Sequence, residues 1–316
     1  MRTDDLLPVE GKLEFRDRNW IEFTDLSEVP DLHGGSPVAN SGESPVRPAV
    51  PSRPAAVTPG ESASITDELQ VLSALHGIGA DLGDPVEVKF SNGQVEVSGV
   101  GVSAERQRQI RGALESLPHV EVAFSDPGAA PVPTQATAPE AAPVFSAEGP
   151  ATDKLQTRLE QQLGGRAELE KFSSRVLDWD EAAMARAYAL RSLAQRFPAN
   201  QEAGMSAEDR RVLRQMAREH VDALLVHIRG MEGVLTPVLT ALGAVQAEQP
   251  RPAAFESWQP ASEQVLASSR RVEVQLSLLL GVASGEKPPA DLPGNLLTAL
   301  KVLRATLDEC KELAAR

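Results

Sequence analysis

A glycine-rich stretch at residues 95–110, "VEVSGVGVSAERQRQI", carries residue types that could bind a dinucleotide. Gly99, Gly101 and Ala104 have the spacing G-x-G-x-x-A, and Glu121 follows at about the distance where such sites place an acidic residue for a ribose hydroxyl. Glycines let the backbone approach a pyrophosphate, and a helix N-terminus offers unpaired N–H groups to it. This motif is the one that would make the chain an NAD(P)-dependent enzyme.

The surroundings of this motif favour a turn over a cofactor site. The preceding strand, residues 95–98, alternates apolar and polar side chains, whereas strands covered on both faces of a parallel sheet are apolar throughout. An Asn-Gly turn at 92–93 pairs this strand antiparallel with the one before it. We therefore expect Gly99 and Gly101 to relax the backbone at the strand exit and Ser103 to cap the next helix, with no cofactor bound. The NAD(P)-binding enzyme is kept as the alternative.

Metal chemistry would need histidines or cysteines at suitable spacing. The two histidines on one predicted helix, His220 and His227, are seven residues apart and thus about 10 Å from each other, whereas metal-binding pairs prefer a spacing of four. His119 follows a helix-ending proline and is expected to face solvent. Cys310 is the only cysteine and is read as a small helix residue, so we expect no metal site. The remaining histidines are His33 and His76.

Two acidic clusters could supply the paired carboxylates of a glycosidase. One comprises Asp178, Asp180 and Glu181, and the other Glu208 and Asp209. We expect both clusters at helix starts or exposed turns, where acidic groups complement the helix dipole. The chain also has no G-x-S-x-G elbow and no phosphate-binding G-K-[ST] loop. We therefore predict no catalytic residues, no cofactor and no enzymatic activity.

Composition limits the classes of partner. The chain has 31 basic and 45 acidic residues and a formal charge of -14, so long-range attraction to nucleic acid or to an anionic membrane is not expected. Aromatic residues make up 4%, which favours helical layers of small aliphatic side chains. With 24 prolines and 23 glycines, part of the chain is expected to be linker.

The first half of the chain divides into a hairpin, a linker and a small domain. Residues 1–32 contain two alternating stretches that predict a short β-hairpin. Residues 33–63 are rich in Pro, Ser, Gly and Ala and are predicted to be a flexible linker. Residues 64–126 predict the order helix, strand, strand, helix, strand. The first helix of this domain has Ile65, Leu69, Leu72 and Leu75 at helical spacing.

The second half is predicted to be helical. A second Pro/Ala-rich linker covers residues 127–151, and residues 152–316 form an antiparallel helical bundle in this interpretation. Ser206 with an acidic residue three positions on predicts the start of one long helix, and Pro237 is expected to kink it. The fold class is therefore α+β. The plausible core-facing residues of the first long helix are Leu169, Phe172, Val176, Trp179, Met184, Leu190 and Phe197.

Residues 64–126 resemble a BON domain, the small αββαβ module of bacterial envelope proteins. The resemblance lies in "NGQVEVSGVGVSAERQRQIRGALESLPHVEVAF", which combines a hairpin, a strand ending in "SG", a polar helix and a final "VEV" strand. It implies an antiparallel sheet with helices on one face, an extracytoplasmic location, and interaction with membrane or protein partners. The sequence departs from the family in the "HGIGADLGDP" that precedes the hairpin.

The order of αββαβ unit, Pro/Ala-rich linker and helical bundle, with "LRSLAQRFPANQEAGMSAEDRRVLRQMAREH" in the bundle, also resembles transmembrane anti-sigma-factor-like proteins of some soil bacteria, in the region outside the membrane. We expect a non-enzymatic envelope or signalling protein with a protein partner, extracytoplasmic or periplasmic if a membrane anchor precedes Met1 and otherwise soluble. No stretch approaches the roughly 20 apolar residues of a membrane helix. A second alternative is a lipid-binding protein that uses an apolar slot in the bundle.

Overall fold

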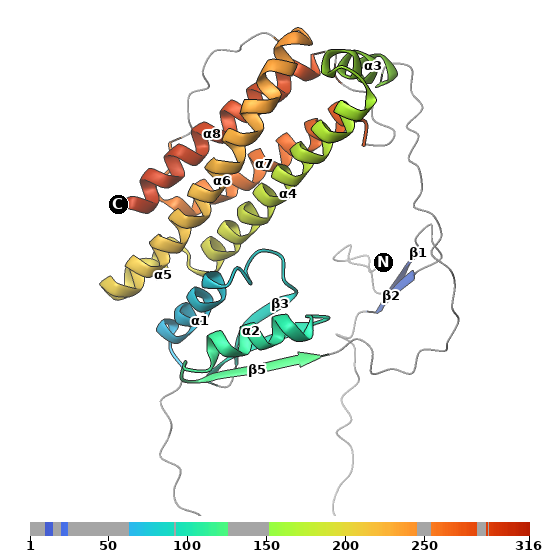
Figure 1. Ribbon diagram of the computed structural model, residues 1–316. Helices are drawn as coiled ribbons and strands as arrows, with labels where there is room; N and C mark the ends of the chain where they lie inside the picture. Colours follow the sequence, from blue (N-terminus) through green and yellow to red (C-terminus); the bar gives the residue numbers. More distant parts are fainter. Residues whose placement is uncertain are drawn as a thin grey trace, which may run out of the picture. The chain divides into compact units, whose positions relative to one another are not determined.

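The computed structural model describes residues 10–14, 20–24, 63–91, 93–125, 152–244, 254–282, 289 and 291–316 (Figure 1). The chain divides into two units, Met1–Thr58 and Pro59–Arg316. The described residues are mostly helical and include a small sheet in the second unit, so the predicted α+β class is confirmed. Of the two predicted linkers, only Ala63 belongs to the described residues.

The first unit contains an antiparallel pair of strands. Strand β1 (Glu10–Glu14) pairs with β2 (Trp20–Thr24), and Leu13 lies opposite Ile21. These strands coincide with the two alternating stretches from which the sequence predicts a hairpin.

The second unit begins with the predicted order of two helices and three strands, which we call the αββαβ module. The elements of the module are α1 (Ile65–Gly77), β3 (Val86–Ser91), β4 (Gln94–Val100), α2 (Ala104–Leu114) and β5 (Val120–Ser125). Helix α1 starts after Ser64, whose side chain accepts a hydrogen bond from the Asp67 amide, and α2 starts after Ser103, whose side chain accepts one from the Arg106 amide.

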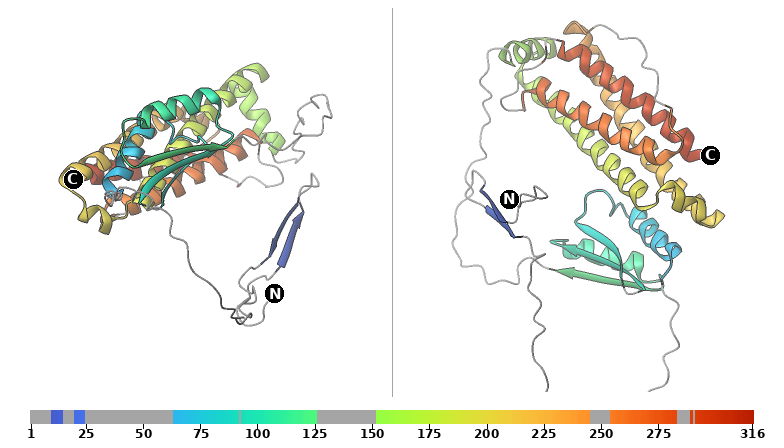
Figure 2. Two further views of the ribbon diagram at one scale, coloured as in Figure 1. Left: turned by 90° about the horizontal axis from the view of Figure 1, so that it is seen from below. Right: turned by 180° about the vertical axis from the view of Figure 1, so that it is seen from behind.

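The sheet of the module is mixed, which corrects the antiparallel sheet that the resemblance implied. Strands β3 and β4 are antiparallel, with Val88 opposite Val97, but β4 and β5 are parallel, with Val97 opposite Val122. The reason is that α2 carries the chain back along the sheet, so that β5 starts at the same end as β4. Helices α1 and α2 cover one face of this sheet (Figure 2), and Ile110 of α2 packs in its core.

The rest of the second unit is a helical bundle. Its elements are α3 (Thr152–Leu163), α4 (Arg166–Arg196), α5 (Ala199–Gly204), α6 (Ala207–Ala241), α7 (Trp258–Leu280) and α8 (Leu292–Ala315). Neighbouring long helices run antiparallel: the end of α4 contacts the start of α7 through Arg191 and Glu263, and Asp222 of α6 pairs with Lys311 near the end of α8. Around the bundle the order is α4, α6, α8, α7 (Figure 2).

The bundle core confirms the helical spacing read from the sequence. Phe172, Val176, Met184, Leu190 and Phe197 of the first long segment are all buried, and the two other predicted core residues, Leu169 and Trp179, are partly buried against them. Helix α6 begins as predicted, because Ser206 accepts a hydrogen bond from the Asp209 amide, and it continues through Pro237.

Among the helices of the described residues, none combines the length and apolar character required to cross a membrane.

Candidate functional site

The site begins at the end of α1, where the chain turns back on itself. Gly79 has a φ of 67°, its amide donates to the carbonyl of His76 over 2.9 Å, and the Ala80 amide donates to the carbonyl of Leu75 over 2.8 Å. This pattern is a Schellman motif, which needs a left-handed residue where the glycine stands. The reversal brings Asp81 next to the imidazole of His76.

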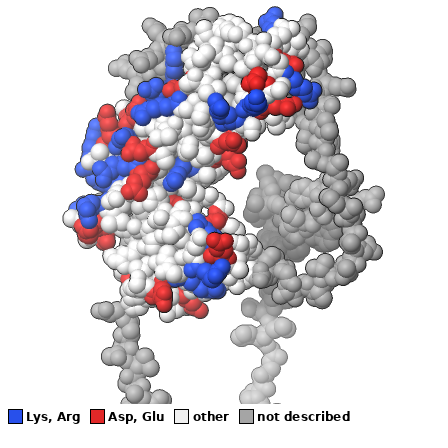
Figure 3. All heavy atoms as spheres, viewed as in Figure 1, with Lys and Arg blue, Asp and Glu red and all other residues white. Residues whose placement is uncertain are grey.

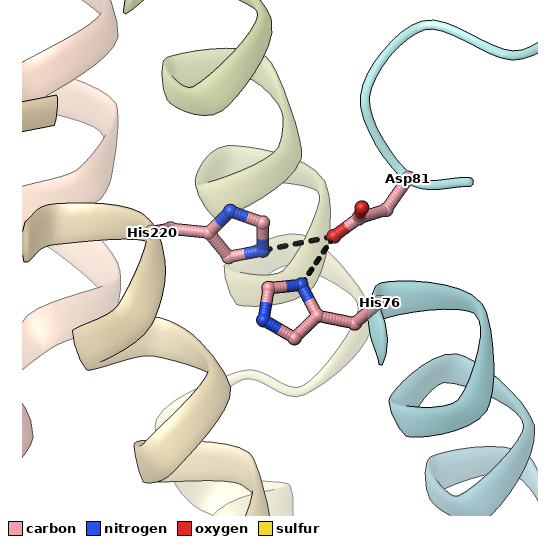
Figure 4. A group of neighbouring side chains, drawn as sticks. All are labelled: His76, Asp81 and His220. Carbon is pink, nitrogen blue, oxygen red and sulfur yellow. Dashed lines mark hydrogen bonds and ion pairs between the residues drawn. The ribbon is translucent and has the colours of Figure 1, made fainter. Parts of the chain in front are cut away.

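Helix α6 supplies a second imidazole from the bundle. Asp81 Oδ2 lies 2.7 Å from His76 Nδ1 and 3.1 Å from His220 Nε2, so one carboxylate oxygen contacts a nitrogen of both imidazoles (Figure 4). The two rings are tilted by 59° with centroids 4.5 Å apart. We call His76, Asp81 and His220 the His-Asp-His cluster; it joins the αββαβ module to the bundle.

A further carboxylate orients the outer imidazole. His76 Nε2 lies 2.8 Å from Glu219 Oε2, and Gln215 donates to the other Glu219 oxygen over 2.9 Å. Both nitrogens of His76 therefore face carboxylates, and the ring is held at both ends.

The cluster is buried at its inner side and open toward a small cavity. The side chain of His220 is 3% exposed, that of His76 11% and that of Asp81 20%. Within the described part of the chain, Asp81 Oδ1 and His220 Nδ1 are buried and have no hydrogen-bond partner. The three side chains line a cavity of about 160 Å³, together with Leu75, Leu193 and other residues of α1, α4 and α6. Unpartnered buried polar atoms of this kind are costly and call for an explanation.

The pKa values of the two imidazoles move in opposite directions. The hydrogen bond to Asp81 raises the pKa of His76 despite partial burial, and Glu219 adds to this effect. Burial lowers the pKa of His220 more than its contact with Asp81 raises it. Burial raises the pKa of Asp81, but the contacts with His220 and His76 together outweigh it and hold that pKa below its usual range. The two carboxylates thus favour the protonated form of His76, whereas burial favours the neutral form of His220.

The cluster has two chemical capacities. As a proton-bearing contact it fastens the module to the bundle through charge-assisted hydrogen bonds. As a donor set of two imidazoles and one carboxylate it has the ligand types that divalent transition metals prefer, with the three donor atoms within 4.8 Å of one another.

The glycines of the G-x-G-x-x-A motif are used for packing and for a turn. A Cβ at Gly99 would lie 2.8 Å from Val102 Cγ2 and 2.9 Å from the carbonyl oxygen of Pro85, so the strand leaves no room for a side chain there. Gly101 has a φ of 74°, and its amide donates to the Ser125 carbonyl over 3.2 Å. Gly101 thus turns the chain at the strand exit, as the sequence predicted. The reason for Gly99 is close packing within the strand, which the sequence did not indicate.

The other histidines singled out in the sequence lie apart from the cluster or outside the described residues. His227 is on α6 with His220, and burial, aided by Arg186, lowers its pKa. His119 has a φ of 57°, and its Nδ1 is buried 3.8 Å from Asp67 Oδ1, so the expected solvent-facing position is wrong for that atom. His33 lies outside the described residues.

One acidic cluster is not where the sequence predicted it. Glu208 and Asp209 do lie in the first turn of α6. Asp180, however, lies in the interior of α4 and is 7% exposed, because the helix begins at Arg166 rather than near the acidic residues. Cys310 is buried against the carbonyl of Trp258, and burial raises the pKa of its thiol to about 12, in keeping with a core residue.

Sequence reasoning missed the His-Asp-His cluster because its members come from two parts of the chain. The available signal was the "HGIGADLGDP" stretch, in which a histidine and two aspartates surround glycines. Nothing in that stretch points to His220 on α6, since only the docking of α1 on α6 brings them together.

Comparisons of the chain with protein-family models, with curated proteins and with solved structures find no match.

Proposed function

We propose that this chain is a non-enzymatic interaction protein of a bacterial envelope or signalling system, the extracytoplasmic part of a membrane-anchored regulator. The αββαβ module, with its resemblance to BON domains, and the helical bundle are its two interaction parts. In this proposal the partner is a protein that presents an amphipathic helix to the bundle.

The observation that carries this proposal is that α1 belongs to two hydrophobic cores. Its Val71 and Leu75 pack in the core of the αββαβ module, while Leu69, 1% exposed, packs in the core of the bundle and Leu72 packs against it. A helix that lays one apolar face on another domain is a common mode of protein recognition. The bundle therefore has a surface that accepts a helix, and α1 occupies it.

Polar contacts surround this apolar contact. The guanidinium of Arg196, at the end of α4, donates from Nε to Glu68 of α1 and from Nη2 to the Val88 carbonyl of β3 over 2.8 Å. Thr66 donates to Asp209 of α6 over 3.0 Å. Such a polar rim around an apolar centre is typical of interfaces between proteins. It supports the proposal that α1 occupies a surface of the bundle on which a partner helix can replace it.

The distribution of charge favours a protein partner over nucleic acid. On the face drawn in Figure 3, basic and acidic side chains are interspersed over the bundle. A nucleic-acid surface would instead gather basic residues on one face, and the formal charge of -14 opposes such a partner at long range.

Affinity capture with the full chain as bait tests the proposal. The variant Arg196→Glu places a carboxylate against Glu68 and weakens the docking of α1. We expect it to retain at least tenfold more of a specific protein from an extract of the source bacterium than the unaltered chain. The double variant Arg196→Glu/Glu68→Arg restores an opposite-charge pair and should return capture to the original level.

Arg191→Glu is the matched control, because Arg191 lies on the same helix and pairs with Glu263 of α7 away from α1. It should not change capture. Capture of the same proteins in equal amounts by all four baits, or of none by any of them, would contradict the proposal.

A further inference from the structure

The atoms of the His-Asp-His cluster that can bind a metal ion lie close to one another. One ligand atom from each side chain lies within 4.8 Å of the other two, and Asp81 Oδ2 contacts both His76 Nδ1 and His220 Nε2 (Figure 4). Around a zinc ion with bonds of roughly 2.0–2.1 Å, tetrahedral ligand atoms are roughly 3.3 Å apart. Shifts of about 1 Å, shared among three side chains, would convert the present contacts into such a shell.

The surroundings contain the second carboxylate that metal-binding histidines use. A histidine ligand usually donates its other N–H to a carboxylate or carbonyl, which fixes the ring and raises its basicity. Glu219 Oε2, 2.8 Å from His76 Nε2, is placed for this role if Nδ1 binds the metal. Glu219 is in turn held by Gln215.

Charge and space also suit a divalent cation. Asp81 and Glu219 together offer two negative charges to balance it. Asp81 Oδ1 and His220 Nδ1 are buried without a hydrogen-bond partner among the described residues, which leaves the second carboxylate oxygen available to a cation. The adjoining cavity of about 160 Å³ leaves room for a water molecule as the fourth ligand.

We propose that His76, Asp81 and His220 form a three-ligand site for a divalent transition metal ion of the zinc class. Two imidazoles and one carboxylate favour zinc and its neighbours over magnesium or calcium, which prefer shells of oxygen atoms. Three protein ligands leave a fourth position toward the cavity.

This site bridges the two parts of the second unit. His76 and Asp81 belong to the αββαβ module and His220 to α6 of the bundle, so a bound ion fastens α1 to the bundle. Because the ion binds the docked arrangement, it stabilises that arrangement by mass action. The metal site does not depend on the identity of any protein partner, and its test is independent of the capture experiment.

Calorimetric titration of the EDTA-treated full chain with zinc chloride tests the site. We expect one zinc ion per chain and a rise in Tm on saturation. Titration with Co²⁺ should give the visible absorption of a four-coordinate ion with nitrogen and oxygen ligands, which reports the ligand set in the unaltered chain.

Two substitutions distinguish a metal ligand from the carboxylate that orients one. Asp81→Asn preserves the shape of the side chain but removes its charge, and we expect it to weaken zinc binding at least tenfold. Glu219→Gln removes only the orienting carboxylate and should weaken binding by about 10–100-fold while leaving one ion per chain. His227→Ala, on the same helix but outside the cluster, is the matched control and should bind zinc as the unaltered chain does.

The proposal is overturned if the unaltered chain binds no zinc. It is equally overturned if zinc binds to Asp81→Asn as tightly as to the unaltered chain, or if His227→Ala abolishes binding, since the ion then resides elsewhere. Circular dichroism of each variant shows whether the helices are intact before the titrations are compared.

Discussion

The indole Nε1 of Trp258 donates a hydrogen bond to Glu202 Oε2 over 3.0 Å, and this contact is fully inside the bundle. Glu202, 4% exposed, also accepts from the amide of Gln259 over 2.6 Å and from the guanidinium of Arg214. One carboxylate from the short helix α5 thus ties together the starts of α6 and α7. A buried charge is tolerated only when partners of this kind surround it.

Glu202→Ala should destabilise the chain by about 3 kcal/mol, because it leaves buried donors of Trp258 and Gln259 without their acceptor. Urea denaturation followed by circular dichroism measures the effect. The matched control is Glu208→Ala, which removes an exposed ion pair with Arg211 and should destabilise the chain much less than Glu202→Ala does. Equal losses in the two variants would show that Glu202 does not organise the bundle end.

Asp180 makes the stability of the bundle depend on pH. Burial, together with the negative charge of Glu273, raises the pKa of Asp180 from 3.8 to about 7. Between these two values the folded chain holds a proton that the unfolded chain has released, so this carboxyl group lowers the free energy of unfolding as the pH rises. Asp180→Asn removes the effect and should be more stable than the unaltered chain by roughly 2–4 kcal/mol at about pH 8, and by much less at about pH 4.

The measurement is urea denaturation of both proteins across this pH range, with the difference plotted against pH. Asp178→Asn serves as the control, because Asp178 is exposed on the same helix. Because its side chain is exposed, this substitution should change the free energy of unfolding at about pH 8 much less than Asp180→Asn does. A difference for Asp180→Asn that does not change with pH would contradict the raised pKa of Asp180.

Gly99 and Gly112 should respond in opposite directions to alanine. At Gly99 the new Cβ would lie 2.8 Å from Val102 Cγ2 and 3.1 Å from Phe124 Cδ1, so we expect a loss of about 1–3 kcal/mol. At Gly112, within α2, a Cβ meets nothing within 4 Å, and we expect a gain of about 0.5–1 kcal/mol. Thermal denaturation compares them; stabilisation of both would show that β4 has spare room at Gly99.

How far the sequence predicts this structure depends on the range of the interactions involved. Helix starts were predictable because their cause is local: Ser103 and Ser206 each cap the amide three residues on. The interior position of Asp180 could not be predicted in this way. An acidic residue at a helix start cannot be told from one in a helix interior until the first residue of the helix is known. The parallel pairing of β5 with β4 was missed for a similar reason, because it depends on where α2 returns the chain.

The His-Asp-His cluster marks the limit of a single sequence. The turn that places Asp81 beside His76 is local and follows from Gly79. The approach of His220 follows from the burial of Leu69 in the bundle core, which is a contact between distant segments. The spacing of residues along the chain does not indicate that two such distant segments are in contact.

Titration with dinucleotides addresses the alternative enzyme. We expect neither NAD⁺ nor NADP⁺ to bind. The space where a Cβ of Gly99 would lie is taken by Val102 and Phe124, and β4 is the centre of a three-stranded sheet rather than part of a nucleotide-binding crevice. Calorimetry on the full chain measures this. Micromolar binding that Gly101→Val abolishes while the helices remain intact would restore the alternative.

The docking of α1 predicts how the second unit behaves after the chain is cut. A specific protease site inserted in the predicted linker at 127–151 separates the αββαβ module from the bundle covalently. We expect the two pieces to elute together in size-exclusion chromatography, because Leu69 is buried in the bundle core and Arg196 donates hydrogen bonds to both Glu68 and the Val88 carbonyl.

Leu69→Asp would bury an unpaired charge at the contact, and its pieces should elute separately. Val226→Asp, a substitution at a residue of α6 that is 64% exposed, is the control and should leave the pieces together. Separate elution of the unaltered pieces would mean that the contact through α1 is too weak to hold the module on the bundle.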